Sequence, residues 1–334
     1  MGQRANLIVI ENNELELYYD HWCANELDAV LFWGVDESIK FFRDHDKKGD
    51  EWWLDTVWCE GGAVIDLDKN ILLWFGGEDI IYDISLRKLL LELMQTNWPG
   101  FRIVWAFEGI ADLAAYAGYD INKVIASKNA FSTDKILSVF NPDEEINYRD
   151  CAISIRNLNN EIEIYTTYLD VSLEEFLLFG SGMVSIKRGA KYYSEYIDNP
   201  ESDNALHSGI HIDPNKKEIH IWSCFEVVVV HHDRLRKAWD GYKLFYHKDD
   251  YEIHTKLTDG KLRFVQRERN VLIHELKQIV CKEFRDPFNT VNTVINALTE
   301  QNKKVEVSAA VFMASKYETN PVLREKMFDR LFIE

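Results

Sequence analysis

Paired cysteines, proline and long apolar runs are all scarce in this sequence. The five cysteines are scattered and never form a C-x-x-C pair, which argues against a zinc ribbon and a secreted disulfide scaffold. Only 6 Pro and 16 Gly occur among 334 residues, so collagen-like and linker-rich chains are excluded. No apolar run approaches the ~20 residues that cross a bilayer. With 46% hydrophobic residues, the chain is expected to form well-packed globular domains.

The N-terminal sequence lacks the features of a leader. Its short apolar run is broken by Glu11 and follows a single Arg, which is not typical of a signal peptide. Asn6 stands where the myristoylation pattern requires Ser or Thr. We therefore expect a cytoplasmic protein.

Positive charge is in deficit, with 38 Lys and Arg against 56 Asp and Glu, a net charge of −18. Residues 261–334 carry 13 basic and 10 acidic side chains, so the whole deficit lies in residues 1–260. Such a field repels phosphate backbones and anionic lipid, so neither nucleic acid nor membrane is an expected partner of this region. It would attract a basic protein partner, although the same charge also serves solubility alone.

Phosphate-binding motifs are missing as well. Gly61-Gly62 and Gly76-Gly77 lack the GK[ST] and G-x-G-x-x-G patterns, and acidic residues follow or precede them. Gly2 also excludes a hydrolase with an N-terminal Cys, Ser or Thr nucleophile, unless the terminus is processed. No cofactor is expected.

What the sequence does contain is internal similarity. Residues 12–18 (NNELELY) match residues 159–165 (NNEIEIY), and GAVID at 62–66 matches GIHID at 209–213. Trp98-Pro99-Gly100-Phe101 corresponds to Trp239-Asp240-Gly241-Tyr242 in the same order along the chain. Matches that keep their order predict a duplication.

Each copy shows the same pattern of expected elements. Alternating apolar residues flank turns, and stretches with leucines three and four residues apart lie between them. We predict an α+β fold made of two tandem hairpin–helix–hairpin–helix–strand repeats with mainly antiparallel sheets, followed by an all-helical C-terminal domain. The expected domains are residues 1–147 (acidic and rich in Trp), 148–260 and 261–334. The last has four expected helices: 271–284, 287–298, about 305–316, and 321–332.

Residues found in one copy only are candidates for function. His21 and Glu60 could serve a thiolate at Cys23 or Cys59 as its base and orienting group. Glu78 completes this candidate catalytic set of His21, Glu60, Glu78 and Cys59. Same-face neighbours such as His21 and Cys23 lie roughly 7 Å apart in a strand, beyond hydrogen-bond reach, and such residues more often belong to the core.

A metal site is a weaker alternative, because these side chains do not show the spacing of metal ligands. In the second copy, a four-residue loop would place His211 opposite His220 and Asp213 opposite Glu218. Two facing imidazoles could bind Zn or Ni, or form a pH-sensitive pair, whereas the ordinary expectation is a solvent-facing hairpin. We assign no metal site.

Tryptophan is concentrated in the first copy, where eight of the 10 Trp fall within residues 22–105. Trp52-Trp53 follows the charged stretch of residues 46–51, and we expect at least one of this pair to be exposed or covered by another group. Trp on an acidic surface is typical of protein interfaces. The expected binding residues are Trp52, Trp53, Trp58 and Asp79.

Over about residues 1–125 the sequence resembles a family of bacterial proteins that has no assigned activity. The similarity rests on these motifs: MGQRAN at the start, Tyr18-Tyr19-x-His21-Trp22, Leu31-Phe32-Trp33-Gly34, Trp58-Cys59-Glu60-Gly61-Gly62, and Phe75-Gly76-Gly77-Glu78-Asp79 with Tyr82-Asp83. The resemblance implies a bacterial cytosolic protein and favours a site that includes His21 and Glu60. A small residue often follows the His-Trp pair in this family, so the resemblance implies that Cys23 is dispensable.

Together these features predict a non-catalytic binding protein that engages a macromolecular partner through an acidic, aromatic surface. An immunity-type or antitoxin-like inhibitor of a basic protein is one form of this expectation. The alternative is a hydrolase or transferase that uses His21, Glu60, Glu78 and Cys59. The sequence does not indicate an oligomeric state.

Overall fold

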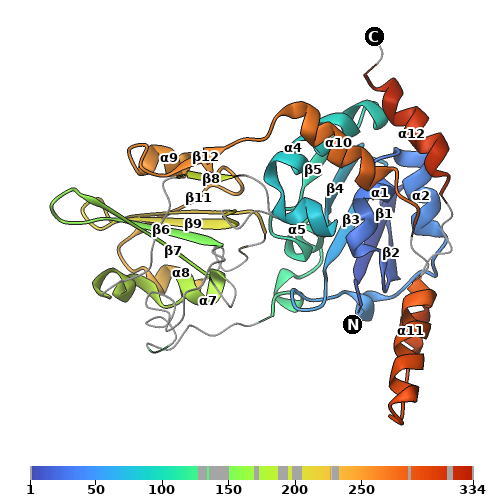
Figure 1. Cartoon of the computed structure of the whole chain (residues 1–334). Coiled ribbons are helices and arrows are strands. Elements are labelled where there is room, and N and C mark those ends of the chain that lie inside the picture. The colour runs from blue at the N-terminus through green and yellow to red at the C-terminus, as the bar shows by residue number, and fades with distance from the viewer. Residues whose placement is uncertain are drawn as a thin grey trace. The chain divides into compact units, whose positions relative to one another are not determined.

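The computed structural model groups the chain into two compact units, each with one five-stranded sheet (Figure 1). The first unit consists of residues 1–81, 86–126 and 269–334, and the second consists of residues 82–85 and 127–268. The structure describes residues 2–126, 134, 150–168, 173–186, 195–197, 205–225, 227, 233–284, 287–313 and 319–332.

The first sheet has the strand order β2-β1-β3-β4-β5. Its strands are β1 (Ala5–Glu11), β2 (Glu14–Asp20), β3 (Gly61–Asp66), β4 (Ile71–Phe75) and β5 (Arg102–Trp105). The β1–β2 and β3–β4 pairs are antiparallel hairpins, whereas β1–β3 and β4–β5 are parallel. Asn12 and Asn13 both have positive φ in the first hairpin turn, a conformation that asparagine tolerates well.

Helices cover this sheet, with α2 against β1 and α5 against β3. The helices before residue 127 are α1 (Leu27–Leu31), α2 (Val35–Arg43), α3 (Glu78–Tyr82), α4 (Ile84–Asn97) and α5 (Ile110–Tyr116). Short 3-10 helices lie at η1 (Cys23–Glu26), η2 (Asp50–Trp52) and η3 (Ile121–Lys123). The core of the first unit is strongly aromatic, and its fully buried side chains include Trp74, Trp98, Phe32, Phe41 and Phe42.

The second sheet repeats this arrangement in the order β7-β6-β9-β10-β11. Its strands are β6 (Cys151–Arg156), β7 (Ile162–Thr167), β9 (Ser208–Asp213), β10 (Glu218–Ser223) and β11 (Lys243–Tyr246). The β6–β7 and β9–β10 pairs are antiparallel, whereas β6–β9 and β10–β11 are parallel. The described helices of this unit are α7 (Leu173–Leu177), η4 (Gly180–Ser185), α8 (Asp233–Ala238) and α9 (Glu252–Leu257). A separate pair joins β8 (Glu195–Ile197) to β12 (Arg263–Val265).

An equivalent tryptophan hydrogen bond occurs once within each unit. Trp98 donates a hydrogen bond from Nε1 to the carbonyl oxygen of Leu31 at 2.7 Å. Trp239 makes the same bond to the carbonyl oxygen of Leu177 at 2.9 Å. In each case the helix that precedes the last strand is tied to the helix that follows the first hairpin.

Each unit also has a glycine with positive φ that lies directly against a backbone carbonyl group. Gly34 has φ 101° and Gly180 has φ 81°, in the region that side chains rarely adopt. A Cβ atom on Gly34 would lie 2.6 Å from the carbonyl oxygen of Asn97, and one on Gly180 would lie 2.3 Å from that of Ala238. These equivalences follow the sequence matches, and the common origin of the two halves stays a prediction.

The expected α+β class is confirmed, but the sheets are mixed rather than mainly antiparallel. Each hairpin reaches the next hairpin through a helical crossover, and a crossover returns the chain in the same direction, which makes the joining pair parallel. The predicted boundaries after residues 147 and 260 stay a prediction.

The C-terminal segment is mostly helical, as expected, with α10 (Arg269–Val280), α11 (Pro287–Glu300), the short 3-10 helix η6 (Ala309–Phe312) and α12 (Pro321–Arg330). Asn320 caps α12 by accepting a hydrogen bond from the backbone N–H of Leu323. Of the helix expected at about 305–316, residues 309–312 form only η6, residues 314–318 lie outside the described residues, and the stretch at 303–308 is non-helical. Valines alternate there with charged residues, which is a period of two rather than of 3.6. β12 is a second exception to the all-helical expectation.

Candidate functional site

Three of the four expected binding residues line one cavity of the first unit. Trp52, Trp53 and Trp58 surround a space of about 280 Å³. We call it the aromatic pocket and define it by its lining residues: Arg4, Tyr19, Glu51, Trp52, Trp53, Leu54 and Trp58. The fourth expected residue, Asp79, lies exposed on α3.

The wall of the pocket is held by a buried asparagine. Asn6 of β1 donates from Nδ2 to the carbonyl oxygen of Trp52 at 3.0 Å and accepts at Oδ1 from the backbone N–H of Leu54 at 2.8 Å. Trp53 stacks on Tyr119, with ring centroids 4.9 Å apart and planes within 13°. Both tryptophans of the pair are therefore half-buried and are fixed by defined partners.

The exposed part of the site is the turn after Asp55. The carboxylate of Asp55 accepts hydrogen bonds from the backbone N–H groups of Val57 and Trp58 at 2.9 and 3.1 Å. These two side chains are 58% and 53% exposed, respectively. An apolar pair presented by a fixed turn beside a cavity is the arrangement expected of an interface anchor.

Cations already contact the rings of the pocket. The guanidinium carbon of Arg4 lies 4.7 Å from the centroid of Trp58, and Nζ of Lys48 lies 5.0 Å from that of Trp52. Burial raises the pKa of Tyr19, so this phenol stays neutral at physiological pH. The rings of Trp52 and Trp58 therefore each already make a cation–π contact with a side chain of the same unit.

The candidate catalytic residues His21 and Cys59 are both buried in the first unit. Nδ1 of His21 shares a hydrogen bond of 2.7 Å with the hydroxyl of Tyr19. Sγ of Cys59 donates to the carbonyl oxygen of Gly61 at 3.2 Å, which is a contact of the protonated thiol.

The candidate carboxylates lie at the surface. Glu60 accepts a hydrogen bond from the backbone N–H of Arg4 at 2.9 Å. Glu78 accepts one from Nδ2 of Asn25, also at 2.9 Å. The four candidate residues thus hydrogen-bond to four different groups, and an active site built from them stays a prediction.

The other candidate nucleophile, Cys23, lies in the core. Burial, together with the charges of Asp20 and Glu26, raises the pKa of its thiol well above the usual value. A thiolate nucleophile needs the opposite shift, which positive neighbours or a helix N-terminus provide. The surroundings of Cys23 therefore favour a structural role.

In the second unit, the expected register of the histidine hairpin is confirmed: His211 pairs with His220, and Asp213 pairs with Glu218. The expected solvent-facing surface is wrong for His211, which is buried. Helix α9 packs against β9 and brings His254 to this face of the sheet.

Hydrogen bonds order the protons of this buried cluster. The indole N–H of Trp222 can only donate, so Nδ1 of His254 accepts at 3.0 Å. His254 therefore carries its own proton on Nε2, which donates to Oγ of Ser154 at 2.7 Å. The hydroxyl of Ser154 in turn donates to Nδ1 of His211 at 2.7 Å. The chain Trp222–His254–Ser154–His211 is satisfied only when both imidazoles are neutral at these positions.

The pKa values agree with neutral rings. Burial, and then the neighbouring His220 and Arg156, lower the pKa of His211 to about 4. Burial, and then His211 and His220, lower the pKa of His254 to about 3.

A second histidine pair continues from the cluster toward solvent. Nδ1 of His220 lies 2.9 Å from Nε2 of His247, and the ring planes are within 5° with centroids 5.2 Å apart. These values describe coplanar rings joined edge to edge by one N–H···N bond, so both facing nitrogens cannot carry protons at once. This bond occupies both facing nitrogens, which is unsuited to chelation of one metal ion.

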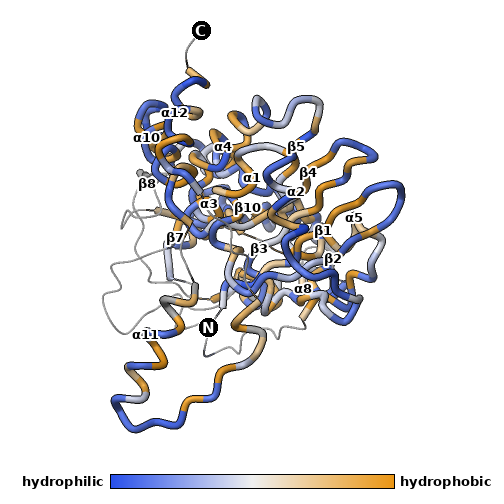
Figure 2. The backbone as a smooth tube through the Cα atoms, turned by 90° about the vertical axis from the view of Figure 1, so that its right-hand side faces the viewer, coloured by the Kyte–Doolittle hydropathy of each residue, from blue (hydrophilic) through white to orange (hydrophobic). Residues whose placement is uncertain are grey.

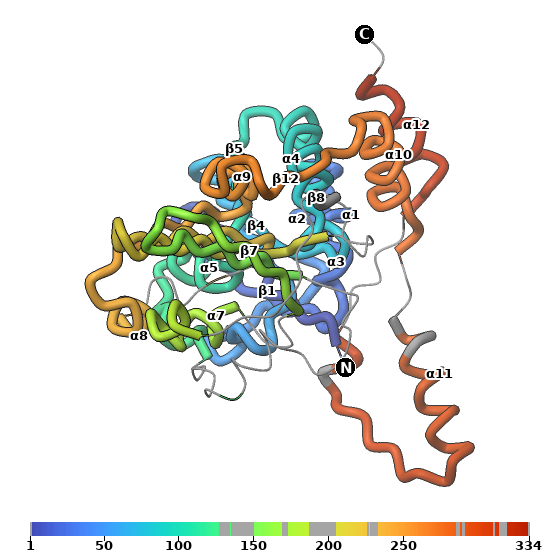
Figure 3. Tube along the Cα trace, turned by 60° about the vertical axis from the view of Figure 1, so that its left-hand side comes forward, coloured from blue at the N-terminus to red at the C-terminus, as the bar shows by residue number. Residues whose placement is uncertain are grey.

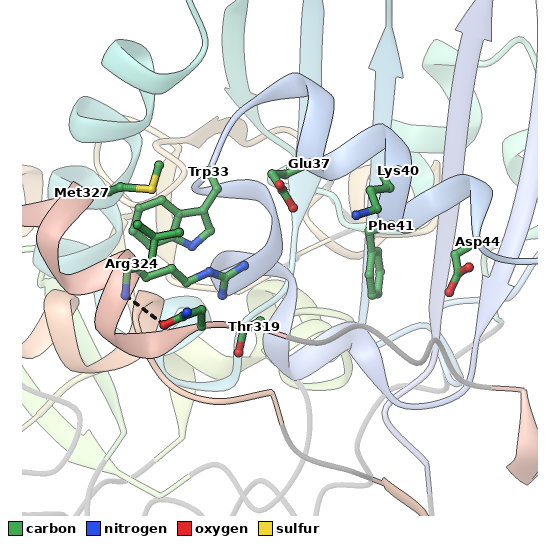
Figure 4. Close-up of a pocket in the computed structure, with 10 residues that line it drawn as sticks. Trp33, Glu37, Lys40, Phe41, Asp44, Thr319, Arg324 and Met327 are labelled. Atoms are coloured by element: carbon green, nitrogen blue, oxygen red, sulfur yellow. Dashed lines mark hydrogen bonds between the residues drawn. The ribbon is translucent and has the colours of Figure 1, made fainter.

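Another cavity, of about 530 Å³, lies in the first unit between α2 and the start of α12 (Figure 4). The guanidinium of Arg324 lies across the ring of Trp33, 5.1 Å from its centroid (Figure 4). Lys40 and Asp44 line the opposite side along α2. Charges of both signs at its rim define no single class of ligand.

The sequence pattern alone did not identify Arg4, Tyr19, Ser154 or His254 as site residues. Asn6 could have indicated the pocket, because a polar residue in an otherwise apolar strand needs a hydrogen-bond partner nearby. Ser154 was a similar signal between Ile153 and Ile155.

Comparison of the chain with protein-family models, with curated proteins and with solved structures gave no significant match. Among the residues that the structure describes, no helix is long and apolar enough to span a membrane. Over the same residues, no cluster of three or more His, Cys, Asp or Glu side chains is arranged to hold a metal ion.

Proposed function

We propose that this protein is a non-catalytic binding protein that engages a basic protein partner through the aromatic pocket. The observation that carries the proposal is the convergence of Trp52, Trp53 and Trp58 on one cavity, with Trp58 and Val57 exposed at its edge. Tryptophan is one of the residue types most enriched among those that dominate binding energy at protein interfaces.

Charge supports a basic partner. Residues 1–81, which include the pocket, contain 6 Lys and Arg against 18 Asp and Glu. Glu51 lines the pocket, and Glu60 lies exposed two residues after Trp58. Acidic groups around an aromatic anchor speed the encounter with a cationic surface and exclude anionic ones. An inhibitor of a basic toxin or nuclease, in the manner of immunity proteins and antitoxins, is one form of this proposal.

A peptide library displayed on phage tests the proposal directly. Selection on the immobilised full chain at low salt should enrich peptides that contain Lys or Arg, and binding should weaken as salt screens the charges. Trp58→Ala should lower the affinity of an enriched peptide at least about tenfold. Leu158→Ala is the matched control, because Leu158 is 82% exposed in a turn of the second unit.

The proposal fails if the enriched peptides carry no excess of Lys or Arg, or if they bind the Trp58→Ala variant as tightly as the wild type. Trp58 is the first choice because it is exposed, whereas Trp52 and Trp53 also pack against the core. A low-salt pull-down with Trp52→Ala/Trp53→Ala is informative only when circular dichroism shows an unchanged fold. A partner that the wild type retains and this folded variant loses supports the same site.

A further inference from the structure

His45 lies two residues beyond the end of α2, and both nitrogens of its ring face hydrogen-bond acceptors. Nδ1 lies 3.0 Å from the carbonyl oxygen of Phe41 and 3.3 Å from that of Phe42. Nε2 lies 2.7 Å from Oδ2 of Asp20, the last residue of β2. A neutral imidazole has one N–H group and one lone pair, so it satisfies only one of these two sides. The ring is satisfied on both sides only as an imidazolium.

The position of the ring favours its positive charge. The carbonyl groups at the end of a helix form the negative end of the helix dipole, which stabilises a cation placed there. Asp20 is 1% exposed, and a buried carboxylate requires a positive partner or several hydrogen bonds. Figure 2 shows α2 beside β1 and β2, the two strands of the hairpin that carries Asp20. The charged ring therefore ties the end of this helix to the end of β2.

The other charges around this pair do not replace it. Charged groups of β2, α2 and the following segment bind one another: Arg43 and Lys47 bind Glu16 at 3.0 and 2.5 Å, and Lys48 lies 3.9 Å from Asp46. Burial raises the pKa of the Cys23 thiol well above its usual value, so this neighbour of Asp20 is uncharged at neutral pH. The negative charge of Asp44, next to His45 in the sequence, favours the same protonated ring.

His45 also belongs to the segment that forms one wall of the aromatic pocket. We call residues 44–53 the pocket loop. Lys48 is its second attachment to β2, because its backbone N–H donates to the carbonyl oxygen of Leu17 at 2.8 Å. The ammonium group of the same lysine lies over the ring of Trp52, and Asn6 holds the far end of the loop through the carbonyl oxygen of Trp52. Movement of the loop at His45 therefore reaches the pocket through Lys48.

We propose that His45 and Asp20 form a proton-operated latch, which holds the pocket loop in its binding conformation while the ring is protonated and releases it when the proton is lost. After deprotonation, either Nδ1 faces two carbonyl oxygens with a lone pair or Nε2 faces the carboxylate with one, and either contact is repulsive. The latch is thus closed at low pH and opens as pH rises through the folded pKa of His45. The effect on binding rests on the function proposed above, whereas the latch itself does not.

Nuclear magnetic resonance of the full chain tests the latch without any ligand. The ring of His45 should carry protons on both nitrogens at pH 6 and titrate with a pKa above 6.5, since the contacts with Asp20 and the two carbonyl groups outweigh burial. The amide of Lys48 should lose protection from exchange between pH 6 and pH 9, corrected for the intrinsic rate. The amide of Leu54, which Asn6 holds, should keep its protection. A neutral ring at pH 6, or a Lys48 amide equally protected at both pH values, overturns the proposal.

Asp20→Asn separates the proton from the contact. The asparagine amide can donate to the lone pair of a neutral ring at Nε2, while its carbonyl oxygen keeps the bonds from the backbone N–H groups of Trp22 and Cys23. The latch of this variant should stay closed at pH 9, and the pKa of His45 should be lowered rather than raised. His274→Gln is the control, because His274 is exposed on α10, which packs against α12 (Figure 3), so its loss should leave the wild-type response. An Asp20→Asn variant that loosens at pH 9 as the wild type does overturns the proposal.

Peptide binding then tests the effect on the aromatic pocket. A peptide enriched on the full chain and charged only through Arg should bind the wild type about fivefold more weakly at pH 9 than at pH 6, but should bind Asp20→Asn equally at both. Arg keeps its charge over this range, so the change cannot come from the peptide. An unchanged affinity in a wild type whose Lys48 amide loses protection overturns regulation of the pocket. If no basic peptide is enriched, the proposed function fails, and the resonance measurements still decide the latch.

Discussion

The two five-stranded sheets share a strand order but fill one equivalent row of positions with opposite chemistry. The row that crosses the first sheet consists of Ile8, Val64, Leu73 and Val104. The corresponding row of the second sheet consists of Ser154, His211, His220 and Phe245. A buried hydroxyl or imidazole costs free energy unless it is hydrogen-bonded, whereas an aliphatic side chain does not. The frame accepts either row, so the histidines are not needed to build it.

Two buried groups of the first unit, His45 and Asp28, respond to acid in the direction opposite to the buried histidines His211 and His254 of the second unit. In the first unit, burial alone would lower the pKa of His45, but the hydrogen bond to Asp20 at 2.7 Å, the charge of Asp20 and hydrogen bonds to the backbone together raise it. Burial raises the pKa of Asp28 to about 6. Both groups favour the folded state most at low pH, and their contribution is lost as pH rises through the folded pKa. The pKa values of His211 and His254 in the second unit are lowered instead, so their contribution to stability is lost in acid.

Selective loss of the second unit in acid is the largest effect that this difference predicts. Folded His211 and His254 stay neutral while their unfolded forms, with pKa near 6.5, take up protons. Their contribution is complete above pH 6.5 and is lost as pH falls toward 4, by about 3 kcal/mol for His211 alone. Hydrogen exchange at pH 4.5 should show faster exchange in β6, β9 and β10 than at neutral pH, corrected for the intrinsic rate, with β1, β3 and β4 still protected.

The other charged groups around this cluster do not cancel the effect. They are Asp213, Glu218 and Asp250, which favour protonation, and Arg156 and Lys216, which oppose it. With these groups present, the pKa values of His211, His220, His247 and His254 are all still lowered. Equal acid sensitivity of both sheets would contradict the predicted difference.

Substitution at the shared glycines should affect each unit alike. Gly34→Ala and Gly180→Ala place a methyl group against a backbone carbonyl at positive φ, so each should destabilise its own unit by about 3 kcal/mol or more. Gly100→Ala and Gly241→Ala are the controls, since both also have positive φ but their Cβ atoms meet no backbone. Denaturant unfolding that finds Gly180→Ala harmless and Gly34→Ala severe would break the equivalence of the two frames.

Much of this frame was predictable from local sequence. The NNELELY and NNEIEIY segments specified two hairpins because turn asparagines and alternating apolar residues are short-range signals. The facing of His211 and His220 followed from loop length alone. The parallel pairs were missed, because strand direction across a crossover depends on contacts far apart in the sequence.

The candidate sites were predictable only in part. Trp52, Trp53 and Trp58 were identified by composition and by adjacency to a charged stretch. Arg4 was not identified, because a strand brings it to the tryptophans from more than 40 positions away. His254 was missed for the same reason, since α9 lies about 100 residues beyond Ser154.

Removal of the hydroxyl of Ser154, which joins His211 to His254, should lower stability less than acid or the glycine substitutions do. Ser154→Ala removes the group that joins His211 to His254 and leaves two buried imidazole nitrogens without that partner, at a cost of about 1–3 kcal/mol. Ile8→Ala in the first sheet is the equivalent core truncation. Ser154→Ala should also move the acid transition of the second unit, whereas Ile8→Ala should lower stability equally at pH 5 and pH 8. A pH-independent loss in Ser154→Ala would mean that the serine does not couple the two histidines.

The smallest expected effect on stability belongs to Trp58, the exposed tryptophan of the proposed binding site. Trp58→Ala removes a side chain that is 53% exposed and loses its contact with Arg4, worth about 0.5–1 kcal/mol. Leu158→Ala in the second unit should cost less than about 0.5 kcal/mol. The two variants should therefore unfold nearly as the wild type does in urea, yet Trp58→Ala alone should lose affinity for basic peptides. If Trp58→Ala lowered the free energy of unfolding by more than about 2 kcal/mol, Trp58 would be important for the stability of the first unit. Its exposure would then no longer argue for an interface.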